Sequence, residues 1–173
     1  MDVVRVFWFD ESSVNCAMTR LYARAFLCER VCEYVLDVCF ECVSVVGALG
    51  LEGVVAPFVF KGTLNGEVFG AYVREVLAPV LKAGDVFMLD NSSVHKVRGV
   101  LDPLLEKGVL GEFLPRYSPD FNPVEFVWSK VKAYLRKVKA RAVDELKEMF
   151  SRALNTITVT DSEGWIKHCC YRL

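Results

Sequence analysis

The chain has 173 residues, a length typical of one domain with a full hydrophobic core. Hydrophobic residues make up 53% of it and charged residues 25%, which excludes a disordered tail and a coiled coil. The 21 basic and 22 acidic residues nearly cancel, so a surface for nucleic acid must come from local clustering of charge.

Signals for membrane insertion and export are missing from the sequence. No uninterrupted apolar run reaches the ~18 residues of a membrane span, and the first residues do not resemble a secretory leader. We therefore expect one globular, cytoplasmic domain over residues 1–173, with no membrane partner and with cysteines that are mostly reduced thiols.

The first half of the chain is rich in predicted strands. Residues 3–9 are apolar apart from one arginine and predict a buried strand that ends at an aspartate. Residues 20–24 and 30–35 resemble short strand pieces that could pair as a hairpin. Residues 43–49 and 54–60 predict two further strands, joined as a hairpin by a short turn.

From residue 65 onward, predicted helices alternate with short buried strands. Residues 65–81 carry apolar side chains at the spacing of a helix. The remaining elements are predicted as strands at 85–90 and 109–114, helices at 94–107, 124–138 and 143–154, and a proline-rich loop at 115–123. This order predicts an α/β fold in which helices cover a mixed sheet.

Three acids stand at the ends of predicted elements. Asp10 and Asp90 follow strands, and Glu125 follows the proline-rich loop. Acids at strand ends face a ligand crevice in many α/β sheets, although single acids there also serve as turn formers or helix caps. If the three carboxylates converge, they form an oxygen-only site suited to two Mg²⁺ or Mn²⁺ ions and to phosphodiester chemistry.

Several motifs around these acids resemble a known family. Glu11 follows Asp10, the string MLDN ends at Asn91, and residues 114–125 read LPRYSPDFNPVE. Residues 91–124 separate the second aspartate from the glutamate, a spacing of 34 residues. In these motifs and this spacing, the chain resembles the catalytic domain of insertion-sequence transposases of the mariner-like superfamily, specifically the insertion-sequence-630 group.

The resemblance implies a ribonuclease-H-like mixed sheet flanked by helices. It makes Asp10, Asp90 and Glu125 the catalytic residues and the ligands of two Mg²⁺ or Mn²⁺ ions. It implies further that the residues just after the second aspartate contact DNA phosphate or steady the metal site, namely Asn91, Ser93 and His95. For the histidine, a solvated ring at a helix N-terminus is the alternative.

The proline-rich loop is expected to deliver the glutamate. Pro119 and Pro123 would stiffen this segment, and Asn122 would cap the following helix before a proline at the first helical position. On that helix, Trp128 is expected in the core or at an interface, or over the edge of the three acids.

The predicted helix at 124–138 and the residues after it are basic. Between Phe126 and Val143 there are six basic residues and no acid: Lys130, Lys132, Arg136, Lys137, Lys139 and Arg141. We expect the first four to bind DNA phosphates, with an ordinary solvated surface as the alternative.

Four of the seven cysteines are closely spaced, at Cys28, Cys32, Cys39 and Cys42. Four thiolates can form a structural zinc site, but no turn former lies inside the second pair. Reduced buried thiols are the main expectation, with zinc and a disulfide as alternatives.

The resemblance implies a prokaryotic DNA transposase that hydrolyses phosphodiesters at transposon ends and transfers the freed 3′-hydroxyl into target DNA. It also implies a homodimer and a TA target, and an N-terminal helix-turn-helix domain supplied by a separate polypeptide or lost. One alternative is a ribonuclease-H-like nuclease. Another is a catalytically decayed or regulatory DNA-binding remnant, suggested by departures from the family pattern such as Ala23 and Cys170, which replace usual glycines.

Overall fold

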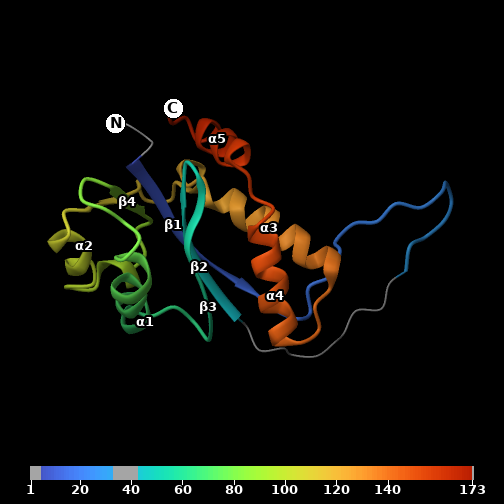
Figure 1. The fold of residues 1–173 in the computed structure, drawn as a ribbon. Coiled ribbons are helices and arrows are strands. Elements are labelled where there is room, and N and C mark those ends of the chain that lie inside the picture. Colours follow the sequence, from blue (N-terminus) through green and yellow to red (C-terminus); the bar gives the residue numbers. More distant parts are fainter. Residues whose placement is uncertain (1–4, 33–42, 173) are drawn as a thin grey trace.

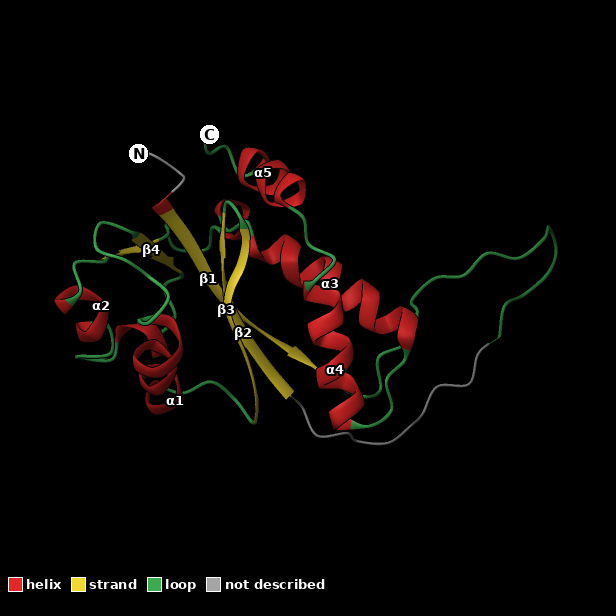
Figure 2. Cartoon of the chain, in the orientation of Figure 1, coloured by secondary structure: helices red, strands yellow, loops and turns green. Residues whose placement is uncertain are grey.

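The computed structural model describes residues 5–32 and 43–172, which form one five-stranded sheet with helices on both faces (Figures 1 and 2). The strand order is β3-β2-β1-β4-β5. Strands β1, β2 and β3 pair antiparallel, whereas β4 and β5 join β1 in parallel. The strands are β1 (Val6–Val14), β2 (Val43–Gly50), β3 (Gly53–Lys61), β4 (Val86–Leu89) and β5 (Leu110–Phe113). The predicted α/β fold with a mixed sheet is confirmed.

Strand β1 is central to the sheet and longer than the sequence predicts. It extends to Val14, because residues 8–14 pair along the whole of β2, with Asp10 opposite Gly47. Ladder hydrogen bonds thus hold a polar segment in the strand that its composition alone would assign to a turn. The first aspartate therefore lies inside the strand and not after it. The predicted hairpin at 43–49 and 54–60 is confirmed as β2 and β3.

One face of the sheet is covered by short helices. They are α1 (Gly66–Tyr72), which continues into a π-helical turn, η2 (Val73–Leu77), then the 3₁₀ turn η3 (Val94–Lys96) and α2 (Asp102–Glu106). The single helix predicted at 94–107 is thus wrong, because residues 97–101 between η3 and α2 are not helical. Gly99 has a φ of 79°, a left-handed conformation that interrupts a helix.

The opposite face is covered by α3 (Val124–Val138) and α4 (Val143–Leu154), both at their predicted positions. A further helix, α5 (Val159–His168), was not predicted. Its start carries a capping box, in which Thr158 and Asp161 exchange hydrogen bonds. This capping motif can be read from the sequence. The segment after it is short and only weakly apolar, so its periodicity does not predict a helix.

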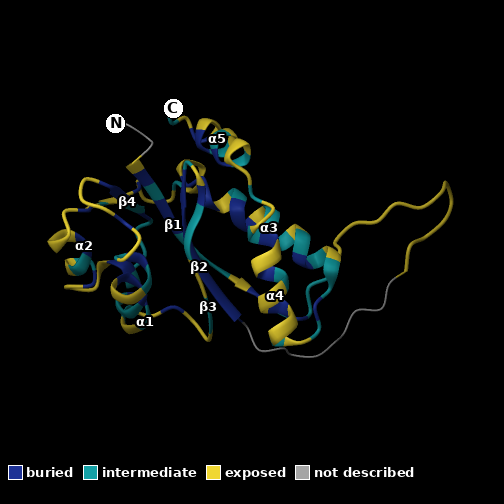
Figure 3. Cartoon of the chain, in the orientation of Figure 1, coloured by how far each residue is buried: buried dark blue, intermediate teal, exposed yellow. Residues whose placement is uncertain are grey.

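Residues 18–32 form no strand. The strand piece predicted at 20–24 is therefore wrong, and so is the part of the piece predicted at 30–35 that the structure describes, residues 30–32. This segment extends from the body and its side chains are mostly exposed (Figure 3), including Tyr22 and Leu27. Within residues 5–32 and 43–172, no strand pairs with this segment to complete its backbone hydrogen bonds. Cys28 and Cys32 are free and exposed here, whereas residues 33–42, with the other two cysteines of the zinc hypothesis, lie outside the described residues.

Three apolar clusters hold the helices on the sheet, and the smallest joins Trp8 of β1 to Ile166 of α5. Phe9, Phe69 and Phe87 belong to the cluster under α1 and α2, and Val127 and Phe150 to the cluster under α3 and α4. None of the helices in the described ranges is both long and apolar enough to cross a bilayer.

Candidate functional site

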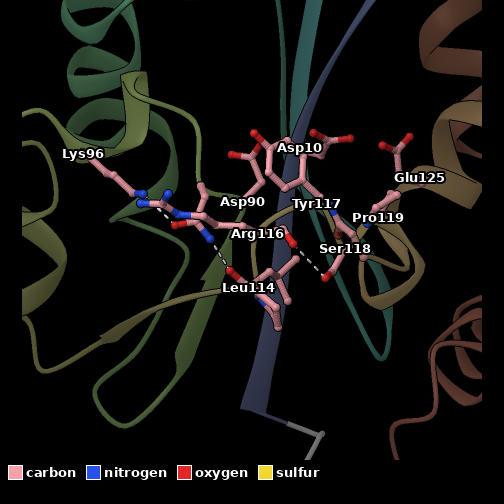
Figure 4. A pocket seen from close by; sticks show the side chains of 12 residues that line it. Asp10, Asp90, Lys96, Leu114, Arg116, Tyr117, Ser118, Pro119 and Glu125 are labelled. Atoms are coloured by element: carbon pink, nitrogen blue, oxygen red, sulfur yellow. Dashed lines mark hydrogen bonds between the residues drawn. The ribbon is translucent and has the colours of Figure 1, made fainter.

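The three acids singled out by the sequence line one cavity. Asp10 lies in β1, Asp90 directly after β4, and Glu125 in the first turn of α3. All three line a cavity of about 380 Å³, and Figure 4 shows their carboxylates along the same side of it. The parallel pairing of β1 with β4 brings the two aspartates together, because both strands run toward the same edge.

Strand geometry separates Asp10 from its neighbour Glu11. Successive side chains of a strand point to opposite faces, so Asp10 faces α3 while Glu11 faces α1 and η3. On the α3 side, the indole Nε1–H of Trp128 donates to Asp10 Oδ2 across 3.1 Å. Trp128 is 2% exposed, so it belongs to the core and also contacts the site.

Asp90 is held from the other face of the sheet. The backbone N–H of Ser92 donates to its Oδ1 across 3.0 Å, and His95 Nδ1 lies 2.6 Å from the same oxygen. These hydrogen bonds lower the pKa of Asp90, and the bond with His95 has the largest effect. An ionised carboxylate only accepts hydrogen bonds, so His95 Nδ1 is the donor in this contact.

The position of His95 contradicts two sequence expectations, the phosphate contact and the solvated ring, while its role in steadying the metal site stays a prediction. Its side chain is 0% exposed and packs against the rings of Phe9 and Phe69, with centroid distances of 5.3 and 4.6 Å. A ring buried in this way is not solvated and offers no surface to a DNA phosphate. The side chain can act on the site only through Asp90 and Glu11.

Glu11 is a fourth acid at the site that the sequence did not identify as functional. Its Oε2 lies 3.6 Å from His95 Nε2, and neither buried atom has a hydrogen-bond partner among the described residues. Burial is the main cause that raises the pKa of Glu11. In the sequence, the only signal for a functional role of Glu11 is its position next to Asp10.

Glu125 differs from both aspartates because it is exposed. A 3₁₀ turn over Pro119–Phe121 precedes its helix, which begins at Val124, so Pro123 takes the N-cap position. The side chain of Asn122 is buried but makes no capping hydrogen bond to α3. The cap expected from Asn122 is thus wrong, whereas its backbone N–H closes the 3₁₀ turn on Pro119.

Burial and the neighbouring acids both raise the pKa of Asp10. Burial, followed by the charges of Glu125, Glu11 and Asp90, raises the pKa of Asp10 to about 8. A buried carboxyl group surrounded by negative charges is stabilised by binding a proton or by a cation beside it.

The donor set fits a hard divalent cation. The three acids offer only oxygen ligands, the type that Mg²⁺ and Mn²⁺ prefer. Among residues 5–32 and 43–172, no three His, Cys, Asp or Glu side chains lie close enough together to hold one ion. Mg²⁺, however, is usually bound by one or two carboxylates, with waters and substrate phosphates as its other ligands. Asp10 with Asp90, and Asp10 with Glu125, are the pairs that would hold such ions.

The residues after Asp90 form one side of the cavity. The side-chain N–H of Asn91 donates to the carbonyl of Leu114, and its Oδ1 accepts from Lys96 Nζ across 2.6 Å, while Ser93 is exposed. Lys96 and Arg116 line the cavity as cations. Neither was assigned from the sequence, although Lys96 directly follows the histidine of the motif.

The basic residues of α3 and its C-terminal end fall into two groups. Lys130 Nζ donates to Asp161 Oδ2 across 2.7 Å and to the carbonyl of Thr156 across 2.9 Å, and Arg141 donates to the carbonyl of Cys16. These two side chains join elements of the fold. Lys132 and Arg136 are half-buried and Lys137 is exposed. DNA contact by these three stays a prediction.

Comparison with known proteins places the chain in a family. The family model for DDE superfamily endonucleases matches residues 5–147, whereas no curated protein matches the chain. Among solved structures, the Mos1 transposase paired-end complex with left transposon end aligns over 97% of this chain and 53% of that chain, at 15% identity and a TM-score of 0.74. The catalytic domain of Mos1 mariner transposase aligns over 97% of this chain and 78% of its own length, at 14% identity and a TM-score of 0.64.

The Mos1 mariner paired end complex with Mn is a third similar structure, at 16% identity and a TM-score of 0.69 over 96% of this chain and 53% of that one. The chain thus spans about half the length of the Mos1 chains in these two DNA complexes. The similarity confirms the ribonuclease-H-like fold. Since the family model covers most of the sequence, the chain belongs to the DDE superfamily of endonucleases.

Proposed function

We propose that this chain is the catalytic domain of a DNA transposase that cuts transposon ends and joins them to target DNA. The observation that carries the proposal is that Asp10, Asp90 and Glu125 line a single cavity. They come from elements far apart in the sequence, in a chain that belongs to a family of DDE endonucleases. An oxygen-only acid cluster of this kind is suited to phosphodiester chemistry.

Two phosphoryl transfers would use the same cavity. In the first, water attacks phosphorus at the transposon end, the P–O3′ bond breaks, and a 3′-hydroxyl is left. In the second, that hydroxyl attacks a target phosphodiester, and a target 3′-hydroxyl leaves. Two bound Mg²⁺ or Mn²⁺ ions would activate the attacking oxygen and neutralise the leaving one. Structures of similar Mos1 complexes were solved with Mg and with Mn.

The chain's own residues would hold and orient the DNA strand. Lys96 and Arg116 place positive charge on the side of the cavity that is bordered by the segment after Asp90. Phosphate contacts of this kind fix the position of a strand without reading its bases. Lys132, Arg136 and Lys137 would extend the phosphate contacts along α3.

Recognition of a particular transposon end requires base contacts, which usually come from a helix in the major groove. The chain spans about half the length of the Mos1 chains, and the Mos1 complex contains a left transposon end. We propose that a helix-turn-helix unit reads the end, and that the working unit is a homodimer on cytoplasmic, prokaryotic DNA with a TA target. Membership of the insertion-sequence-630 group stays a prediction.

Metal-dependent nicking of a plasmid that carries the element's ends tests the proposal. We expect Mn²⁺-dependent nicks that the Asp90→Asn variant abolishes. Asp120→Asn is the matched control, because Asp120 is an exposed acid of the proline-rich loop before Glu125 and does not line the cavity. Binding without nicking would indicate a decayed or regulatory remnant. Preferred cleavage of RNA–DNA hybrids would indicate a nuclease.

A further inference from the structure

The two aspartates of the site each accept a hydrogen bond from a buried ring. Trp128 Nε1 lies 3.1 Å from Asp10 Oδ2, and His95 Nδ1 lies 2.6 Å from Asp90 Oδ1. The rings approach from opposite faces of the sheet, Trp128 from α3 and His95 from η3. One aspartate is thus tied to each of the two apolar layers.

Both rings are fixed by packing. A Cβ placed on Gly47, the β2 partner of Asp10, would lie 3.6 Å from Trp128 Cη2, so the indole lies over the sheet at this point. The indole also stacks on the ring of Phe150, at a centroid distance of 6.5 Å. His95 is enclosed as described above, between two phenylalanines, Asp90 and Glu11. Neither ring can turn away from its aspartate without leaving the core.

Glu125 has no comparable restraint. Its side chain is exposed and accepts no hydrogen bond within the described part of the chain. The site therefore combines two carboxylates of fixed orientation with one that is free to adjust.

We propose that Trp128 and His95 are positioning residues that hold Asp10 and Asp90 ready for divalent ions, while Glu125 adjusts to complete the site. The inference rests on the proposed function. Groups that hydrogen-bond a metal ligand orient it, and their loss typically weakens metal binding by ~10–100-fold. Packed rings are effective in this role because an orientation set in advance costs no ordering entropy when the ion binds.

Mn²⁺ binding to the chain without DNA, measured by electron paramagnetic resonance, tests the role of Trp128. We expect Trp128→Phe, which keeps an aromatic ring but removes the N–H, to weaken Mn²⁺ binding by roughly 10-fold. Trp8→Phe is the matched control, since Trp8 is a buried indole on the same face of β1 that donates to none of the three acids. It should lower the melting temperature at least as much and leave Mn²⁺ affinity unchanged.

Two variants test His95 in the same assay. The amide of His95→Asn can place an N–H donor near the position of Nδ1, so this variant should keep most of the Mn²⁺ affinity. His95→Leu removes the donor and should lose roughly 10-fold or more. Loss of Mn²⁺ affinity in His95→Asn as large as in His95→Leu, or an unchanged affinity in both, would contradict the role of His95, so the asparagine variant still tests it if the leucine variant does not fold.

The outcomes separate this inference from the proposed function. Wild-type Mn²⁺ binding that is insensitive to Asp90→Asn would overturn the metal chemistry itself. Binding that depends on Asp90 but is equal in wild type and Trp128→Phe, or weakened equally by Trp8→Phe, would overturn the positioning role alone.

Discussion

Lys130 Nζ lies 2.7 Å from Asp161 Oδ2, which joins helix α3 to the capping box of α5. The same ammonium group donates to the carbonyl of Thr156 and lies 5.9 Å from the ring centroid of Trp165. The pKa of Asp161 is lowered to about 2, and the hydrogen bond from Lys130 is the largest cause. A residue that the sequence assigned to DNA contact thus has a packing role that any DNA would have to compete with.

We expect Lys130→Ala to destabilise the chain by about 1 kcal/mol, since partly exposed ion pairs contribute little more. The melting temperature should fall by about 2–4 °C in calorimetry. Lys132→Ala is the control, because no ion pair is formed by Lys132 in the described structure. It should leave the melting temperature unchanged and weaken DNA binding. If instead Lys130→Ala weakened DNA binding and left the melting temperature unchanged, Lys130 would be a DNA-contacting residue.

The remaining basic residues of α3 should determine the salt dependence of DNA binding. Each lost phosphate contact lowers the slope of log K against log salt by about 0.9. Replacing Lys132, Arg136 and Lys137 with alanine should therefore make the slope shallower by about three units in fluorescence anisotropy. The control triple variant removes exposed cations of α4 and α5, namely Lys147, Arg152 and Lys167. An equal change in both triple variants would indicate a nonspecific charge effect.

Glu125→Gln should separate catalysis from metal binding. We expect the variant to lose nicking activity, because the third carboxylate would be needed to hold the second ion. It should keep most of the affinity for a first Mn²⁺ ion, since one or two carboxylates suffice for one ion. Isothermal titration calorimetry with Mn²⁺ would measure this, with Asp90→Asn as the comparison that loses both. A Glu125→Gln variant that loses all Mn²⁺ binding would contradict the prediction.

The stability of the metal-free chain should fall as pH rises toward 8. Asp10 has a folded pKa of about 8 against an ordinary value of 3.8, so the folded state binds more protons between these values. Stability therefore decreases with pH in this window, and the raised pKa of Glu11 acts in the same direction. The lowered pKa of Asp90 has the opposite effect, at more acidic pH.

Thermal melts in chelator from pH 5 to 8 would measure this dependence. In Asp10→Asn the slope should flatten, because the amide does not titrate. Added Mg²⁺ should raise the melting temperature most at the upper end of the range, where the carboxylates are free of protons. A wild-type melting temperature that rises steadily from pH 5 to 8 would contradict the assignment.

Cys170 has a φ of 65°, a left-handed conformation that favours glycine. Cys170→Gly should therefore stabilise the chain by about 1 kcal/mol. Cys170→Ala is the control, since it removes the thiol but keeps the Cβ, and it should bring no gain. Urea unfolding of the three proteins would distinguish relief of backbone strain from loss of the thiol.

Local sequence was sufficient to predict much of the fold and to single out three acids that line one cavity. The boundaries of α3 and α4 follow from apolar periodicity, which depends only on near neighbours in the chain. The acids were identifiable because each stands in a short motif next to an apolar strand or a proline-rich loop.

Only the tertiary structure decided how the site is built around those acids. Asp10 lies within a strand because β2 pairs with it, and residues 18–32 form no strand because no described segment pairs with them. His95 is buried between Asp90 and Glu11, and Trp128 reaches Asp10 across 118 positions of sequence. These contacts depend on how distant segments pack on the two faces of one sheet, and the identity of each residue and its neighbours does not specify that packing.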